Sequence, residues 1–164
     1  MVRLAPLTEE AFATWRRDAI PDYAQDKAEA GNWLPEVALE RSEAEFSRFL
    51  PEGLATPDQH FFSIVDAATG NQVGVVWFAV ADWSGRRAAF ILDFLVYEPF
   101  RRHGFAFQAL SALEAEVRAL GLDTMELHVF GHNRAARALY EKAGFEVTNV
   151  NMAKHLPPMA ASSS

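Results

Sequence analysis

The chain has 164 residues, of which 50% are hydrophobic and 23% are charged, as in an ordinary soluble globular domain. It contains no cysteine, which excludes disulfides, a thiolate nucleophile and cysteine-based zinc or iron–sulfur sites. Its formal net charge of −7 argues against a nucleic-acid partner, which would need a basic face. The first residues do not resemble a signal peptide, and the longest apolar run, Val73–Ala81, is too short to span a bilayer. We therefore expect a cytoplasmic protein with no membrane partner.

The acidic residues gather in the N-terminal third. Residues 1–60 hold 12 acidic and 6 basic side chains, whereas residues 61–164 hold 10 and 9. A solvated acidic helix surface would explain this excess. The alternative is a divided site, with a basic side for a cofactor and an acidic side for a cationic substrate.

The N-terminal third is predicted to contain a short strand and two helices. Val2–Pro6 alternates weakly, which favours a strand. Thr8 is a suitable N-cap for a helix that we expect Pro21 to end, with a loop or broken helix over Asp22–Trp33. Pro35 then opens a second helix with one apolar face.

Three strands joined by tight turns are expected next. The strands are His60–Ala67, Gln72–Ala81 and Ala88–Tyr97, and turn residues separate them at 69–71 and 82–85. Strands joined by such short turns pair side by side in opposite directions. The first part of the sheet is therefore predicted to be antiparallel.

The C-terminal part alternates helices with strands. Apolar residues at helical spacing predict a helix over Phe105–Leu120, and Thr124–Phe130 reads as a strand. Asn133 is the N-cap of a further helix that ends at Gly144–Phe145, and Glu146–Leu156 is predicted to be the last strand.

A strand–helix–strand connection of this kind gives two parallel strands with a right-handed crossover. We therefore predict an α+β fold in three layers, built on a mixed, mostly antiparallel sheet with one parallel pair. Residues 1–157 are expected to form a single domain, and residues 158–164 a disordered tail.

The segment Arg101–Ala106 lies where a buried strand runs into a helix. Gly104 allows close approach of a ligand to the backbone, and the first-turn N–H groups of the helix have no partner within it. These groups and the helix dipole suit a phosphate or pyrophosphate, and Arg101 and Arg102 add mobile positive charge. For Gly104 alone, an ordinary strand-to-helix turn is the alternative.

A second pattern follows this loop in the chain. It reads N-x-x-A-x-x-L-Y-x-x-x-G-F and is carried by Asn133, Ala136, Leu139, Tyr140, Gly144 and Phe145. Together the two segments resemble the GNAT N-acetyltransferase superfamily. Its coenzyme A loop has the form Q/R-x-x-G-x-G/A, matched here by Arg101, Gly104 and Ala106.

The resemblance implies the GNAT fold, with acetyl-CoA as cosubstrate in a wedge where the two parallel strands splay apart. The pantetheine arm would pair with the backbone of Phe94, Leu95 and Val96, as an added strand pairs with a sheet edge. The pyrophosphate would lie on the N–H groups of Arg102, His103, Gly104, Phe105 and Ala106. Asn133 would contact the pantetheine in addition to capping its helix.

Tyr140 is the expected general acid. Acyl transfer from a thioester expels coenzyme A as a thiolate, and a phenol within reach can protonate it. The matching tyrosine of the family often has this role. The alternative is a buried tyrosine that only packs against the core.

Two residues are candidates for the base that deprotonates the attacking amine. His128 lies beside the predicted splay and titrates near neutral pH. Asp93 stands in an otherwise apolar strand, where burial would raise its pKa unless it is paired. A packing histidine and a structural carboxylate are the alternatives. The histidines His60, His132 and His155 show no metal-ligand spacing with carboxylates, so no metal is predicted.

We therefore predict an acetyltransferase that acts by direct attack in a ternary complex, with a small-molecule or peptide amine as acceptor. The acidic N-terminal third suggests a cationic amine, and the family resemblance is compatible with a homodimer. A non-catalytic acyl-CoA-binding sensor or regulatory domain is the alternative, and the preferred acyl chain stays open.

Overall fold

The structure is a computed structural model, and it describes residues 1–83 and 85–160. Its elements in chain order are β1 (Val2–Pro6), α1 (Glu9–Glu29), α2 (Pro35–Phe49), a short 3-10 turn η1 (Gly53–Ala55), β2 (Gln59–Asp66), β3 (Gln72–Trp83), β4 (Arg86–Val96), a second 3-10 turn η2 (Glu98–Phe100), α3 (Phe105–Ala119), β5 (Met125–Leu127) and α4 (Arg134–Lys142). The turn predicted over 82–85 includes Ser84, which lies outside the described residues.

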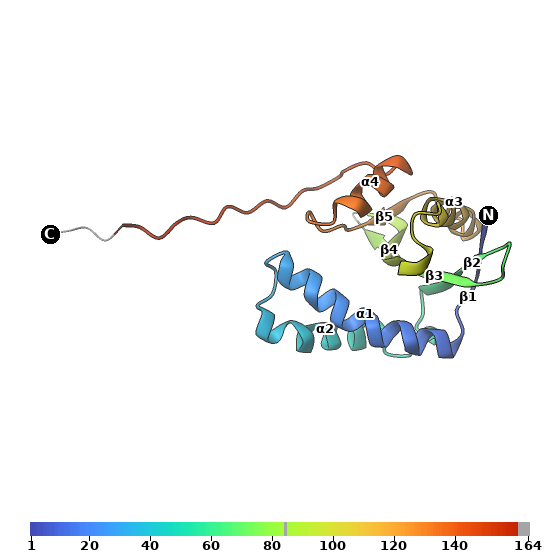
Figure 1. Ribbon diagram of the computed structural model, residues 1–164, viewed down its shortest axis with the longest axis horizontal. Helices are drawn as coiled ribbons and strands as arrows, with labels where there is room; N and C mark the ends of the chain where they lie inside the picture. The colour runs from blue at the N-terminus through green and yellow to red at the C-terminus, as the bar shows by residue number, and fades with distance from the viewer. Residues whose placement is uncertain (84, 161–164) are drawn as a thin grey trace.

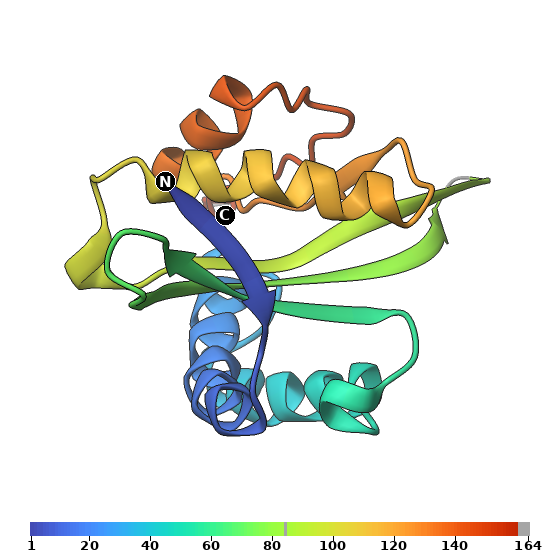
Figure 2. The same cartoon turned by 90° about the vertical axis from the view of Figure 1, so that its right-hand side faces the viewer.

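The five strands form one sheet in the order β1-β2-β3-β4-β5. The pairs β1–β2, β2–β3 and β3–β4 are antiparallel, and β4–β5 is parallel. Helices α1 and α2 cover one face of the sheet, and α3 and α4 cover the other (Figures 1 and 2). The predicted three-layer α+β fold with one parallel strand pair is therefore confirmed.

The sheet carries a hydrophobic core on each face. On the α1 and α2 side, Trp15 and Phe46 pack with Trp77 of β3. On the other side, Phe78 of β3 packs with Leu110 and Leu113 of α3. Because neighbouring strand residues point to opposite faces, the consecutive pair Trp77 and Phe78 contributes one large side chain to each core.

Hydrogen bonds and backbone angles confirm several of the predicted helix ends and turns. The Thr8 hydroxyl accepts a hydrogen bond from the Ala11 N–H at 3.1 Å and caps α1. Gly144 has φ of 98°, and the Phe145 N–H donates to the Tyr140 carbonyl at 2.9 Å, as a Schellman ending requires. The hairpin turn after β2 has Gly70 in the left-handed region, with φ of 76°.

The predicted end of the first helix at Pro21 is wrong. Helix α1 contains Pro21 and continues to Glu29. Proline lacks an N–H, so it costs the helix one hydrogen bond, but tertiary contacts outweigh that loss. Ile20 and Ala24 on either side of it are buried, and the buried Ser42 hydroxyl of α2 donates to the Ile20 carbonyl at 2.7 Å.

The two strands predicted near the C-terminus also differ from the structure. Strand β5 spans Met125–Leu127 rather than 124–130, because its partner β4 turns away after Ile91. The strand predicted over 146–156 is absent. Residues 146–160 are exposed, form no helix or strand and run away from the rest of the chain in Figure 1. A sequence pattern can favour a strand, but a strand also needs a partner.

Candidate active site

Strands β4 and β5, the last two strands of the sheet, separate part-way along their length. Their pairing covers three residue pairs and ends at Ile91 and Leu127. Just beyond, β4 contains a bulge, because Trp77 of β3 lies opposite Asp93 while the next residue, Phe78, lies opposite Ile91. The extra residue bends β4, which stays paired with β3 as far as Val96 but is no longer paired with β5. The predicted splay is therefore present, and Phe94, Leu95 and Val96 lie in the part of β4 beyond the last pair with β5.

The bulge also reverses the alternation of side chains along β4. Before it, Ala89 and Ile91 belong to the core on the α3 side, and after it Phe94 contacts the same core. Leu92 packs against the opposite core, and Asp93 bonds to Trp15 of α1. In a regular strand residues two apart share a face, so Asp93 would lie on the same face as Ile91. The bulge thus aims a carboxylate toward α1.

The loop before α3 is built to present backbone groups. Arg102 and Gly104 have positive φ values of 66° and 78°, and Gly104 is the N-cap of α3 with no side-chain cap. The first-turn N–H groups of α3 are therefore not capped by the side chain at the N-cap position. The Arg101 guanidinium donates to the Val96 carbonyl at 2.9 Å, so this arginine ties the loop to the end of β4. The sequence-based expectation of a mobile charge is wrong for Arg101.

Tyr140 lies on the inner side of α4. Its ring centroid is 6.5 Å from that of Phe94 and 5.7 Å from that of Phe145. Burial raises the pKa of Tyr140 to about 12, with a further contribution from the negative charge of Asp93. The phenol is therefore protonated at neutral pH and available as a proton donor.

Asp93 is held by hydrogen bonds in an apolar surrounding. The Trp15 indole N–H donates to a carboxylate oxygen at 2.7 Å. Burial raises the pKa of Asp93, the hydrogen bonds from Trp15 and the Phe94 backbone act in the opposite direction, and the charges of Asp22 and Asp26 raise it further. A carboxylate with a raised pKa is a better proton acceptor than an ordinary one.

His128 follows β5 directly, at the point of separation. Its ring lies 4.9 Å from Phe130, edge to face. Partial burial lowers the pKa of His128, and the positive charge of Lys27 in α1 lowers it further. The imidazole is therefore neutral at pH 7, the form in which it can accept a proton.

Comparison with known proteins agrees with this geometry. The sequence profile of the acetyltransferase (GNAT) family matches residues 12–145. The chain belongs to this family. It is 41% identical over 155 residues to the uncharacterized N-acetyltransferase YycN of Bacillus subtilis, which covers 94% of this chain and 99% of YycN. YdgE of the same organism, also an uncharacterized N-acetyltransferase, is 34% identical over 153 residues, covering 93% of this chain and 97% of YdgE.

Solved structures give the same assignment. The crystal structure of YycN aligns with a TM-score of 0.90 at 40% identity, covering 96% of this chain and 100% of that one. An acetyl transferase from Pyrococcus furiosus, 20% identical with a TM-score of 0.61 over 95% of this chain and 100% of that one, shares the fold. The chain is thus a GNAT acetyltransferase, a family whose cosubstrate is acetyl-CoA. No helix within residues 1–83 and 85–160 has the length and apolar character that a membrane span requires.

In this GNAT acetyltransferase Asn133 is a helix cap, as predicted. Its side-chain oxygen accepts the Ala136 N–H at 3.2 Å. The cap places the start of α4 beside the loop that follows β5. Contact of the Asn133 amide with pantetheine stays a prediction.

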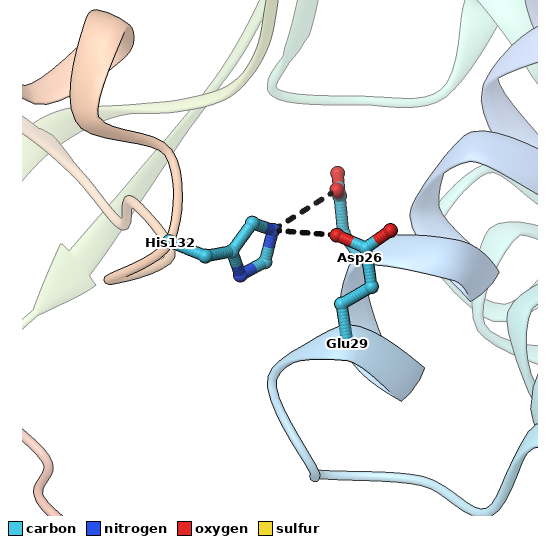
Figure 3. Close-up of side chains that lie close together, drawn as sticks. All are labelled: Asp26, Glu29 and His132. Carbon is cyan, nitrogen blue, oxygen red and sulfur yellow. Dashed lines mark ion pairs between the residues drawn. The ribbon is translucent and has the colours of Figure 1, made fainter.

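The sequence analysis missed a cluster formed by His132, Asp26 and Glu29. The His132 ring nitrogen is 3.5 Å from an Asp26 oxygen and 3.3 Å from a Glu29 oxygen (Figure 3). The three ligand atoms lie within 4.8 Å of one another, close enough to hold a cation. The prediction of no metal rested on sequence spacing, which cannot detect a cluster that the fold assembles from α1 and a loop more than a hundred residues later.

The same cluster borders an acidic pocket at the end of α1. This pocket has a volume of about 370 Å³ and is lined by Asp22, Gln25, Asp26, Glu29, His132 and Asn133. Partial burial raises the pKa of Asp22, and the neighbouring charges of Asp18 and Asp26 raise it further. The negative charges of Asp22 and Asp26 also raise the pKa of Asp93 in β4.

Proposed function

We propose that this GNAT acetyltransferase transfers the acetyl group of acetyl-CoA to the primary amine of a cationic small molecule or peptide, by direct attack in a ternary complex. One observation carries the proposal. The loop before α3, the separation of β4 from β5, Asp93 and Tyr140 all lie near the last residues of β4.

Donor binding would use backbone groups. The arm of acetyl-CoA would pair with Phe94, Leu95 and Val96, and its pyrophosphate would lie on the turn from Arg102 to Ala106. Support comes from the left-handed residues of that turn and from the Arg101 bond to Val96, which join the two binding segments.

The chemical step needs a base, an oxyanion donor and an acid. Asp93 or His128, directly or through water, would take a proton from the acceptor ammonium. The free amine would attack the thioester carbonyl, and a backbone N–H near Val96 would stabilise the oxyanion. Collapse of the tetrahedral intermediate would break the C–S bond, and Tyr140 would protonate the departing thiolate. No covalent acyl-enzyme is required.

The acceptor would enter from the acidic pocket. Asp22, Asp26 and Glu29 line it, and Asp22 and Asp26 interact electrostatically with Asp93. The negative charges would attract a cationic amine along this path toward the point where β4 and β5 separate. A neutral or acidic amine would not be attracted in this way.

The direct test is thiol release from acetyl-CoA in the presence of a panel of amines. Cationic primary amines should give turnover, and neutral and acidic amines should give little. A protein that binds acetyl-CoA by calorimetry but acetylates no amine would instead be an acyl-CoA sensor. Faster turnover with succinyl-CoA or another acyl donor would mean that the enzyme transfers a different acyl group, still to an amine acceptor.

The same assay distinguishes the two candidate bases. Asp93→Asn and His128→Gln would each be measured for kcat/KM across pH. The variant that removes the true base should lose the acidic limb of the profile, because the active form of either base is the deprotonated one.

A further inference from the structure

The structure holds the two candidate bases differently. The Asp93 carboxylate accepts hydrogen bonds from the Trp15 indole N–H, at 2.7 Å, and from the backbone of Phe94. Within residues 1–83 and 85–160 the ring nitrogens of His128 have no hydrogen-bond partner, and the ring lies edge to face against Phe130. A base that a third group orients is typical of sites that activate an attacking group. Only Asp93 has such a group.

The orienting group is itself fixed by packing. The Trp15 side chain is 4% exposed. Its ring is surrounded by four others at centroid distances of 5.2–5.9 Å, those of Phe12, Phe46, Phe61 and Trp77. Close packing on this scale leaves the indole plane little freedom, so the direction of its N–H is set by the core. The bond to Asp93 joins residues 78 apart in the chain and carries this fixed direction from α1 to β4.

The same bond acts on the proton affinity of Asp93. Burial raises the pKa of the Asp93 carboxyl, whereas the hydrogen bonds from Trp15 and from the Phe94 backbone lower it. A hydrogen bond to a charged group is strong enough to change a pKa by about one to two pH units. Loss of the Trp15 bond would therefore raise the pKa of Asp93 further.

Other titratable groups surround the carboxyl. The negative charges of Asp22 and Asp26 of α1 raise the pKa of Asp93. Three tyrosines nearby have raised pKa values and stay neutral in the acidic range, namely Tyr23, Tyr97 and Tyr140. Among these neighbours, Trp15 is the side chain that favours the ionised carboxylate.

We propose that Trp15 is a positioning residue that makes Asp93 the base of the reaction. Its indole N–H holds the carboxylate in one orientation and favours the ionised form, which takes a proton from the acceptor ammonium before the amine attacks. The inference rests on the acetyl transfer proposed above. Trp15 acts through Asp93 and needs no contact with acetyl-CoA or the acceptor.

Nuclear magnetic resonance of the indole N–H groups tests the bond without substrate. The chain has four tryptophans, and Trp15→Phe and Trp77→Phe identify two of the signals. The Trp15 signal should move as Asp93 ionises, and Asp93→Asn should abolish this movement. The Trp77 N–H should respond much less, because it donates to the neutral Gln59 side chain at 2.7 Å. A Trp15 signal that is constant with pH, or that moves equally in Asp93→Asn, would overturn the inference.

The pH profile of kcat/KM tests the role in the reaction. Trp15→Phe keeps a ring in the core and removes the N–H, so the acidic limb should move to higher pH by about one to two pH units. Trp77→Phe is the matched control. Trp77 is also 4% exposed, lies opposite Asp93 on β3 and donates a bond of the same length, but to Gln59. Its loss should leave the limb in place, and KM for acetyl-CoA should stay unchanged in both variants.

Fluorotryptophan provides a second variant should Trp15→Phe fail to fold. Fluorine on the ring makes the indole N–H a stronger donor with little change of shape. Protein carrying fluorotryptophan at all four positions should therefore show an acidic limb moved to lower pH, and Asp93→Asn should remove this effect. An unmoved limb in both Trp15→Phe and fluorotryptophan protein would refute the positioning role.

The results separate this inference from the proposed function. Turnover of cationic amines with an acidic limb that His128→Gln removes and Trp15→Phe leaves in place would refute the role of Trp15 and retain the amine acetyltransferase. Absence of turnover with every amine would refute the proposed function, and with it Asp93 as a base, even where the indole titration shows the bond.

Discussion

Tyr140 and Asp93 come from distant parts of the chain, and the charge of Asp93 acts on the phenol of Tyr140. The negative charge of Asp93 adds to burial and brings the pKa of Tyr140 to about 12. The phenol rests in its protonated form near neutral pH, so it holds a proton to donate and does not serve as a base. The thiolate of coenzyme A is the group in the proposed reaction that needs this proton.

Tyr140→Phe should lower kcat by roughly 10²- to 10⁴-fold, the usual contribution of a general acid. The variant loses a hydroxyl and keeps the ring contacts with Phe94 and Phe145, so acetyl-CoA affinity should be nearly unchanged. Steady-state kinetics and calorimetry would measure the two effects.

Tyr97→Phe is the matched control. This tyrosine also carries a partly buried hydroxyl, which accepts a hydrogen bond from Gln72 at 3.1 Å, but it packs on the opposite face of the sheet. Its kcat should stay within about twofold of the native value, a difference of about 0.4 kcal/mol. Equal kcat for native protein and Tyr140→Phe at every pH would remove Tyr140 from the mechanism.

Asp93→Asn should make the folded protein more stable at neutral pH. Burial raises the pKa of Asp93 above its ordinary value of 3.8, so the folded state holds this proton more tightly than the unfolded state. The ionised carboxylate therefore costs stability above the raised pKa, by about 1.4 kcal/mol for each tenfold increase in proton affinity. The cost disappears as the pH falls through the raised pKa to 3.8. The amide oxygen of asparagine can still accept the Trp15 hydrogen bond.

Urea unfolding between pH 7 and pH 4 would measure this effect. The advantage of Asp93→Asn over the native protein should shrink as the pH falls. Glu114→Gln, an exposed position on α3, should show no such trend. A constant difference between Asp93→Asn and native protein over the whole range would mean that Asp93 is not desolvated in solution.

At the scale of elements, β4 organises the site. Its bulge ends the pairing with β5, turns Asp93 toward α1 and leaves Phe94 facing α4. One extra residue in a strand thus produces both the separation that would hold the cofactor and the orientation of the carboxylate. At the C-terminal end of β4, the bond from Arg101 to the Val96 carbonyl joins the strand to the loop before α3.

Gly104→Ala should weaken acetyl-CoA binding and also destabilise the protein. At φ of 78° an alanine is strained by about 1–2 kcal/mol, although its Cβ would meet only the Gln108 side chain at 3.7 Å. The strain would distort the turn that presents the first N–H groups of α3. Calorimetry with acetyl-CoA and denaturant unfolding would measure the two losses.

Gly121→Ala provides the comparison. Gly121 ends the same helix with φ of 80° and open space around its Cβ position, so the backbone cost should be similar. It lies at the far end of α3, and its loss of stability should come without a loss of acetyl-CoA affinity. Equal affinity losses in both variants would mean that the loop before α3 has no special part in binding.

At the scale of the whole molecule, the two helical layers meet across the splay. His132, in the loop before α4, lies against Asp26 and Glu29 of α1 (Figure 3). Tyr140 and the loop before α3 lie on one side of this contact, and the carboxylates of the acidic pocket come from α1 on the other. A reaction between acetyl-CoA and a cationic amine would take place between the layers.

Neutralising the acidic pocket should weaken binding of the acceptor amine and leave binding of acetyl-CoA unaffected. Asp22→Asn and Asp26→Asn should each raise KM for cationic acceptors about fivefold to tenfold, equivalent to about 1–1.4 kcal/mol, with little change in KM for acetyl-CoA. The effect should shrink at high salt, because exposed charges are screened. Kinetics at two ionic strengths would measure it.

Glu36→Gln is the control for this prediction. It removes an acidic charge from the exposed start of α2, outside the acidic pocket, and should leave KM for the acceptor unchanged. Equal effects of all three substitutions would point to overall net charge rather than to a site. No effect of any substitution would contradict a cationic acceptor.

Local signals in the sequence predicted most elements and the turn that leads into α3. Thr8, Asn133 and Gly144 specify their helix ends through hydrogen bonds within a few residues, so their roles can be read from neighbours in the chain. Pro21 shows where such reading fails. The buried contacts of α1 with α2 outweighed the preference of a single residue.

The amino-acid sequence by itself determined the order of helices and strands from β1 to α4, the loop from Arg101 to Ala106 and membership of the GNAT family, since each depends on nearby residues in a recognisable pattern. Only the tertiary structure decided the rest. The bulge of β4, the bond from Trp15 to Asp93 and the approach of His132 to α1 all join residues far apart in the chain. Spacing along a sequence cannot report such distances, because they are set by how the layers pack.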